Sequence, residues 1–225
     1  MMKNQWSDKK AAAAVRSVRR AGVPKPLADC IYASRLLGAD RKLVLHGGGN
    51  TSVKTHVFDL SGMSVEGLHV KASGHDLADI EANGFTTLDL AQLRRLEELN
   101  ALSDIDMLAA LTRAKLRPSE SAPSVETLLH AFLPAPYIFH THANAVLALT
   151  NQSNGKSIVE KICGDEVIVL PYAMSGFALA KRAAAAVRRS PGAKALVVMK
   201  HGVFTFGKTA KDAYGHMIDL ANRAE

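Results

Sequence analysis

Cysteine is scarce in this chain of 225 residues, and Cys30 and Cys163 are the only two. Two cysteines so far apart do not make the disulfide framework of a small secreted domain, so we interpret both as idle or buried thiols. Long apolar runs are also missing, since no stretch approaches the roughly 18 residues that span a bilayer. The N-terminal stretch 1–20 lacks the hydrophobic segment of a signal peptide. We therefore expect a cytoplasmic protein that does not insert into a membrane.

Glycine motifs for nucleotides are absent as well. The turn Gly47-Gly48-Gly49-Asn50 is not followed by the Gly-Lys-Ser/Thr of a P-loop, and its spacing is not that of a dinucleotide fingerprint. No Gly-x-x-x-Gly-x-Gly turn occurs elsewhere in the chain. The sequence therefore does not resemble a dehydrogenase.

The charge is basic but evenly spread, with a formal net charge of +7. Small basic clusters occur at 16–20 and 181–189, and no aromatic residues are interleaved with them. Nucleic acid is therefore not the expected partner. A small anionic substrate, such as a phosphorylated or carboxylated sugar, suits this charge.

The composition, 48% hydrophobic and 22% charged, is that of an ordinary globular protein. Because we find no internal repeat and no long linker, we expect one domain over residues 1–225. Helices and strands mix without strict alternation, which predicts an α/β fold with a central, mostly antiparallel sheet flanked by helices. The predicted helices cover 8–21, 26–37, 89–111, 125–133, 143–150, 157–162, 177–189 and 209–224, and the predicted strands cover 53–60, 68–72, 137–142, 167–170 and 195–199.

Two histidines close one of these strands. Side chains alternate along a strand, so His140 and His142 share a face, with Cα atoms roughly 6 to 7 Å apart. Two imidazoles on one face can bind a single zinc ion. His-x-His alone is a weak motif, and ordinary strand histidines are the alternative.

Polar turns follow two further strands. Gly49 belongs to a glycine turn that can expose N–H groups to an anion, with Asn50 beside it, and Ser73 and Gly74 form a second turn. Both turns could converge on one anion. A tight hairpin and a helix cap are the structural alternatives.

A carboxylate completes the set of candidate groups. We expect Ser124 to cap helix 125–133 and Glu126 to lie in its first turn, where a capping or solvated acid is common. His130, four residues later on the same face, is interpreted as a histidine packed in the core or supporting the site from outside the ligand set. With His201 at another strand end, three imidazoles and a carboxylate match a catalytic zinc site, in which the metal stabilises an enediolate and the carboxylate moves the proton.

Together these segments resemble the class II aldolase/adducin family, in which they occur in the same order. The likeness is greatest to the aldolase half of bifunctional aldolase/short-chain dehydrogenases, including the rhamnulose-phosphate type. The segments that carry it are Gly48-Gly49-Asn50-Thr51-Ser52, Ser73-Gly74, Arg117-Pro118-Ser119, Pro123-Ser124-Val125-Glu126-Thr127-Leu128-Leu129-His130, His140-Thr141-His142 and Lys200-His201-Gly202-Val203.

The resemblance implies zinc or another divalent metal on His140, His142 and His201, with Glu126 as proton shuttle and, as an open alternative, a further ligand in the resting enzyme. It also implies a homotetramer with sites between subunits, acting as an aldolase on a small sugar phosphate. The phosphate would be held by Gly49, Asn50, Ser73, Gly74 and Ser124.

Two departures from the family pattern stand out. Val125 replaces a serine of the fuculose type and supplies no hydroxyl to a phosphate. No tyrosine stands where some aldolases place a second proton donor, so Tyr172 and Tyr214 are candidates by default, with core or surface roles as alternatives. Epimerase, dehydratase and decarboxylase activities of the same family also stay open, as does a non-catalytic adducin-like interaction domain.

Overall fold

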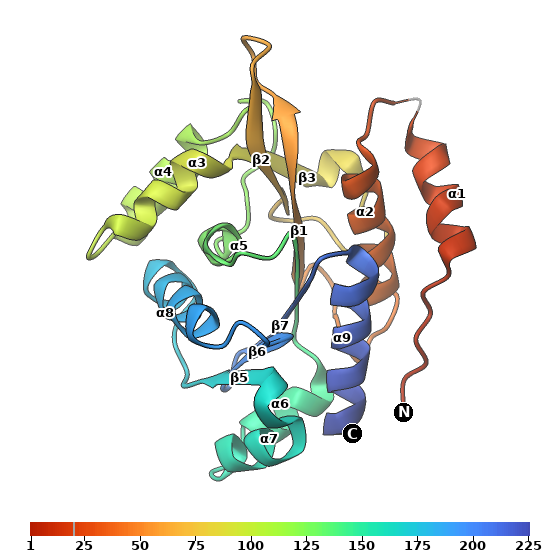
Figure 1. The fold of residues 1–225 in the computed structure, drawn as a ribbon, viewed down its shortest axis with the longest axis vertical. Helices are drawn as coiled ribbons and strands as arrows, with labels where there is room; N and C mark the ends of the chain where they lie inside the picture. The colour runs from red at the N-terminus through yellow and green to blue at the C-terminus, as the bar shows by residue number, and fades with distance from the viewer. Residues whose placement is uncertain (20) are drawn as a thin grey trace.

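The computed structural model describes residues 1–19 and 21–225, which form a seven-stranded sheet with helices on both faces (Figure 1). The predicted helix 8–21 is α1 (Asp8–Arg19), and Arg20, which also belongs to a predicted basic cluster, lies outside the described residues. The strands are β1 (Asn50–Phe58), β2 (Ser64–Lys71), β3 (Phe85–Asp89), β4 (Tyr137–Thr141), β5 (Val167–Leu170), β6 (Ala195–Val198) and β7 (Gly202–Gly207).

The helices that follow α1 are α2 (Lys25–Gly38), α3 (Leu90–Arg95), α4 (Asp104–Arg113), α5 (Thr127–Phe132), α6 (Asn144–Thr150), α7 (Gly155–Cys163), α8 (Phe177–Arg189) and α9 (Ala210–Ala224). Short 3-10 turns stand at η1 (Ala82–Gly84), η2 (Leu96–Glu98) and η3 (Gly164–Glu166). In the described part of the chain, no helix is long and apolar enough to cross a membrane.

The strand order is β3-β2-β1-β4-β7-β6-β5, and every neighbouring pair is antiparallel except β5 and β6. The predicted α/β fold with a mostly antiparallel sheet is confirmed. In the register of β1 and β4, Asn50 lies opposite His140 and Ser52 lies opposite Ile138. This pairing brings the end of the glycine turn beside the first histidine of the strand.

Two hydrophobic cores sandwich the sheet. Helices α3, α4, α5 and α8 cover one face, and α2 and α9 cover the other, with α1 packed outside α2 (Figure 1). The alternation of β4 divides its side chains between them, so Phe139 enters the α2 core and Ile138 enters the α5 core. Both are fully buried, and each such side chain contributes about 1.5–3 kcal/mol on burial.

The predicted helix 89–111 is wrong as one element. Asp89 ends β3 and caps α3 by accepting a hydrogen bond from Gln92 N at 3.0 Å. Ser103 caps a separate helix, α4, through Asp106 N at 3.1 Å. The leucine spacing is similar in both pieces, but two caps start two helices, and strand β3 precedes them.

The predicted cap at Ser124 is also wrong. Helix α5 begins at Thr127, and Glu126 occupies the position before it without a capping hydrogen bond from its side chain. Ser124 instead shapes the turn, since its carbonyl accepts from Thr127 N at 3.1 Å. The carboxylate of Glu126 therefore makes no hydrogen bond to the helix end and can interact with the histidines.

Candidate metal centre and active site

Three imidazoles converge at one end of the sheet. His140 is the penultimate residue of β4, His142 directly follows that strand, and His201 lies in the turn between β6 and β7. Their candidate ligand atoms all lie within 4.8 Å of one another. Nε2 of His140 is 3.0 Å from Nε2 of His142, less than twice the roughly 2.0–2.1 Å of a zinc–nitrogen bond. One ion can therefore contact both rings.

The ring of His140 is held from two directions. It stacks on Phe204 with ring centroids 4.0 Å apart and an interplanar angle of 17°. Its Nδ1 lies 3.0 Å from the carbonyl oxygen of Val203, which can only accept, so Nδ1 donates. The lone pair of the neutral ring is then on Nε2, the atom that faces His142.

The β6–β7 turn that carries His201 approaches β4 closely. Lys200 adopts a left-handed conformation with φ of 59°. At Gly202, a Cβ atom would lie 2.7 Å from the carbonyl oxygen of Thr141 and 2.8 Å from Cε1 of His140. Only glycine leaves both strands at this separation, which sets the distance from His201 to the β4 histidines.

Glu126 closes the cluster from the side of α5. Its Oε1 is 3.1 Å from Nε2 of His201, and its Oε2 is 3.4 Å from Nε2 of His140. Asn50 Nδ2 donates to Oε2 at 2.7 Å, and Ser175 Oγ donates to Oε1 at 3.0 Å. The carboxylate is thus buried, fully engaged and directed at the imidazoles.

Charge and burial act in opposite directions on these groups. Burial acts to raise the pKa of Glu126, whereas the neighbouring His140 and hydrogen bonds from His201 and Asn50 act to lower it, and together they hold the pKa well below its usual range. Burial lowers the pKa of His140 to about 4 and also lowers the pKa of His142. At neutral pH the site therefore combines the Glu126 carboxylate with neutral rings of His140 and His142, the protonation states that a cation requires.

The residues present fit a divalent cation. Three imidazole nitrogens and a carboxylate form a donor set typical of zinc. Within residues 1–19 and 21–225, His201 Nδ1 is the only buried side-chain polar atom without a hydrogen-bond partner. The unsatisfied atom belongs to this cluster, where a bound ion would complete the polar contacts.

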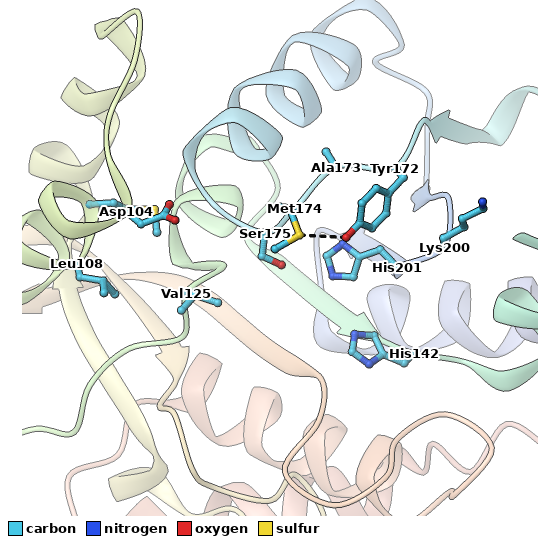
Figure 2. Close-up of a pocket in the computed structure, with 11 residues that line it drawn as sticks. Asp104, Leu108, Val125, His142, Tyr172, Ala173, Met174, Ser175, Lys200 and His201 are labelled. Carbon is cyan, nitrogen blue, oxygen red and sulfur yellow. Dashed lines mark hydrogen bonds between the residues drawn. The ribbon is translucent and has the colours of Figure 1, made fainter. Parts of the chain in front are cut away.

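A cavity of about 610 Å³ opens onto His142 and His201 (Figure 2). Tyr172, Ser175 and Lys200 line it beside the histidines, and Val125 lies across from them on the side of α4. Its size and position suit a small polar molecule that reaches the cluster from solvent.

The family model of the class II aldolase and adducin N-terminal domain matches residues 28–225. This chain belongs to the class II aldolase/adducin family. It is 36% identical over all 225 residues to the uncharacterized oxidoreductase YuxG of Bacillus subtilis (strain 168), and it spans 31% of that protein's length.

Two solved structures share the fold. The N-terminal class II aldolase domain of a conserved protein from Thermoplasma acidophilum has a TM-score of 0.89 and 38% identity, with 100% of this chain and 98% of that chain covered. L-fuculose-1-phosphate aldolase from Thermus thermophilus has a TM-score of 0.54 and 21% identity, over 88% of this chain and 92% of that chain. The second likeness concerns the fold alone.

The residues that the family resemblance assigns to phosphate lie close to the cluster but do not line the 610 Å³ cavity. Ser73 N donates to Ala122 O at 2.8 Å, which brings the Ser73-Gly74 turn beside the segment that leads to Ser124. Asn50 Nδ2 lies 3.4 Å from Ser124 Oγ. Gly49, with φ of +66°, packs against the backbone of His140, where a Cβ would lie 2.8 Å from the carbonyl oxygen.

The two candidate tyrosines lie in different environments. Tyr214 is buried in the α2 core, and its hydroxyl accepts from Gln5 N at 3.2 Å, so the core role holds for it. Tyr172 lines the cavity, and its hydroxyl donates to Met174 Sδ at 3.0 Å (Figure 2).

Ser175 is a site residue that sequence reasoning missed. It precedes α8 and lies 49 positions from Glu126, and nothing in its spacing connects the two. Lys200 also lines the cavity, although the sequence indicates no role for it beyond its place in the Lys200-His201-Gly202-Val203 motif. Its position directly before His201 is the signal that could have placed it there.

Proposed function

We propose that this member of the class II aldolase/adducin family is a zinc-dependent lyase. It cleaves or forms a carbon–carbon bond in a small sugar phosphate. The observation that carries the proposal is the position of Glu126, an ionised and buried carboxylate within 3.4 Å of His140 and 3.1 Å of His201. Burial of a charged carboxylate costs free energy unless hydrogen-bond or charged partners compensate for it. The burial of Glu126 beside three imidazoles therefore supports a functional role for its carboxylate.

His140, His142 and His201 are the proposed ligands. When bound, zinc or another divalent cation supplies Lewis acidity, which polarises substrate oxygens and stabilises the negative charge that develops on them. In this proposal the neutral ring of His140 releases no proton on binding, since it already carries its proton on Nδ1, away from the cluster.

Glu126 is the proposed proton carrier. Its carboxylate accepts a proton from the substrate and returns one when the carbon–carbon bond has been made or broken. Asn50 and Ser175 occupy one oxygen each and keep the carboxylate in one orientation. Tyr172, at the wall of the cavity, is the proposed second proton-transfer group: it donates a proton to the aldehyde oxygen as that oxygen becomes a hydroxyl in condensation, and it takes the proton back in cleavage.

The glycine turn and its neighbours are proposed to hold the substrate's phosphate through Gly49, Asn50, Ser73, Gly74 and Ser124. Asn50 contacts both Glu126 and Ser124, and Ser73 N donates to Ala122 O in the segment that leads to Ser124. The chain's charge of +7 favours an anion. We further propose that residues 1–225 act as one domain, in a cytoplasmic homotetramer.

The test is aldol cleavage of a panel of ketose 1-phosphates by purified protein, before and after treatment with a chelator and after zinc is restored. Cleavage that is lost with the metal and returns with zinc supports the proposal. A protein that binds no divalent ion would instead favour a scaffold of the adducin kind. If the protein binds metal but cleaves none of the panel, the epimerase, dehydratase and decarboxylase alternatives of the same family are tested on related substrates.

A further inference from the structure

A chain of buried polar side chains leads away from Glu126, and none of its members lines the cavity. Asn50 Nδ2 donates to Glu126 Oε2 at 2.7 Å, Asn50 Oδ1 lies 2.5 Å from Nε2 of His130, and Nδ1 of His130 lies 2.7 Å from Ser52 Oγ. Ser52 and His130 are fully buried, and Asn50 and Glu126 are 6% and 7% exposed. Each of these hydrogen bonds is therefore shielded from water, and replacing one of them by a hydrogen bond to solvent would cost free energy.

The direction of each hydrogen bond follows from the first. An ionised carboxylate only accepts, so the amide of Asn50 must turn its NH₂ group toward Glu126 and its oxygen toward His130. That oxygen also only accepts, so Nε2 of His130 must carry the ring proton. Nδ1 then holds the lone pair, and the hydroxyl of Ser52 donates to it. Burial lowers the pKa of His130 to about 3, which agrees with a neutral ring.

The fold places these residues without strain. Asn50 and Ser52 are two apart on β1 and share a face, while Glu126 and His130 are separated by one turn at the start of α5. The ring of His130 meets Phe204 edge-on, with centroids 6.1 Å apart. The same phenyl ring stacks on His140, so both histidines pack against one rigid side chain.

We propose that Ser52, His130 and Asn50, together called the relay, are positioning residues for Glu126. This proposal rests on the proton-transfer role given to Glu126 above. The Ser52 hydroxyl sets the tautomer of His130, His130 sets the orientation of the Asn50 amide, and that amide sets the carboxylate. Ser175 holds the other oxygen. The amide of Asn50 thereby directs its two N–H groups at Glu126 and Ser124.

The first test needs neither substrate nor metal. In protein labelled with ¹⁵N-histidine and freed of metal by a chelator, a long-range ¹H–¹⁵N spectrum reports which ring nitrogen of each histidine is protonated. We expect His130, assigned by comparison with His130→Gln, to be protonated at Nε2 and unprotonated at Nδ1. Ser52→Ala should shift the Nδ1 resonance. A His130 ring protonated at Nδ1, or one unaffected by Ser52→Ala, would overturn the relay whatever the protein catalyses.

The second test measures turnover of the metal-loaded protein. His130→Leu removes the donor to Asn50, whereas the side-chain amide of His130→Gln can restore it. We expect His130→Leu and Ser52→Ala to lower kcat roughly 10- to 100-fold at unchanged metal content and little changed KM, as for other residues that orient a reacting group. His130→Gln should recover most of the loss.

The matched control is Ser34→Ala. Ser34 is also a fully buried serine, and it bonds Thr51 Oγ1 at 2.7 Å and Cys30 O at 2.6 Å, away from Glu126. Ser34→Ala should leave kcat unchanged. If His130→Leu does not fold, Ser52→Ala carries the test alone. Full kcat in Ser52→Ala, or a loss in Asn50→Ala confined to the KM for a phosphorylated substrate, would refute the relay while leaving the lyase proposal standing. The expected tautomer in a protein without aldolase activity would refute the lyase proposal only.

Discussion

Gly202 and His140 are in contact at the limit of what the backbone allows, since a methyl group on Gly202 would lie 2.8 Å from Cε1 of the imidazole. The carbonyl oxygen of Thr141 would lie 2.7 Å from the same methyl group, so neither side of the contact can move away freely. The close approach of β7 to β4 is thus a requirement of the histidine cluster and not only of sheet pairing.

Gly202→Ala should therefore separate the strands and disperse the proposed ligands. We expect lower zinc affinity together with a loss of about 1–3 kcal/mol in the free energy of unfolding, the usual effect of overpacking. Zinc titration and chemical denaturation measure the two effects. Gly192→Ala is the matched control, because the described residues leave open space around that position. A Gly202→Ala protein that binds zinc as tightly as the parent would contradict this account.

His142→Ala should remove metal and activity together, because the two remaining imidazoles hold a divalent ion weakly. Metal analysis of the purified variant after dialysis measures the loss. His56→Ala, which removes an exposed histidine of β1, serves as control and should retain the full metal content. Undiminished metal in the His142 variant would exclude that residue from the ligand set.

Glu126→Gln should keep much of the metal and lose most of the turnover. The amide preserves shape and some hydrogen bonding, but it cannot accept a proton, and general acid–base groups contribute roughly 10²- to 10⁴-fold to the rate. Steady-state kinetics on a protein of verified metal content decides the point. Turnover equal to that of the parent would remove Glu126 from the proton-transfer role.

Stability should fall in acid because of His69, which lies on β2 and outside the histidine cluster. Its ring bonds Thr55 Oγ1 at 3.1 Å and Thr87 Oγ1 at 3.0 Å, and burial lowers its pKa to about 4 from an ordinary 6.5. The folded state therefore prefers the neutral ring. The contribution of the neutral ring to the free energy of unfolding is fully present above pH 6.5 and is lost as pH falls toward 4. The total loss is about 3 kcal/mol at 1.36 kcal/mol per pKa unit.

Urea denaturation of the parent and of His69→Gln between pH 4 and 7 measures this contribution. The difference in unfolding free energy between the two proteins should change across that range, because only the parent can take up a proton there when it unfolds. The same comparison with His56→Gln, at an exposed position of β1, controls for the loss of a histidine. A constant difference for His69→Gln would show that the buried ring does not govern acid stability.

Local patterns were sufficient for much of this fold. The strand that carries His140 and His142 is apolar and alternates, and the burial of its residues in two cores is the direct result. Leucine periodicity did not separate α3 from α4, because a repeat of buried residues contains no information about where a helix is interrupted. The signal was the pair of capping residues, Asp89 and Ser103.

Spacing alone predicts the site only where neighbours in sequence are neighbours in space. His201 and Glu126 were placed with the β4 histidines by family resemblance, and the structure brings these four residues together. The contacts of Asn50 with Glu126 and of Ser175 with Glu126 span 76 and 49 positions. Such pairs depend on strand order and on the path of loops, and no periodicity in the chain encodes them.

The register of β1 against β4 has a practical consequence for anyone who prepares this protein. A slip of one residue would turn Asn50 and Ser52 to the other face of the sheet, because side chains alternate along a strand. The three histidines come from β4 and from the β6–β7 turn, so a mispaired chain would keep a place for an ion. Metal content alone is thus a poor assay of correctly assembled material, and turnover per bound ion is the quantity by which preparations should be graded.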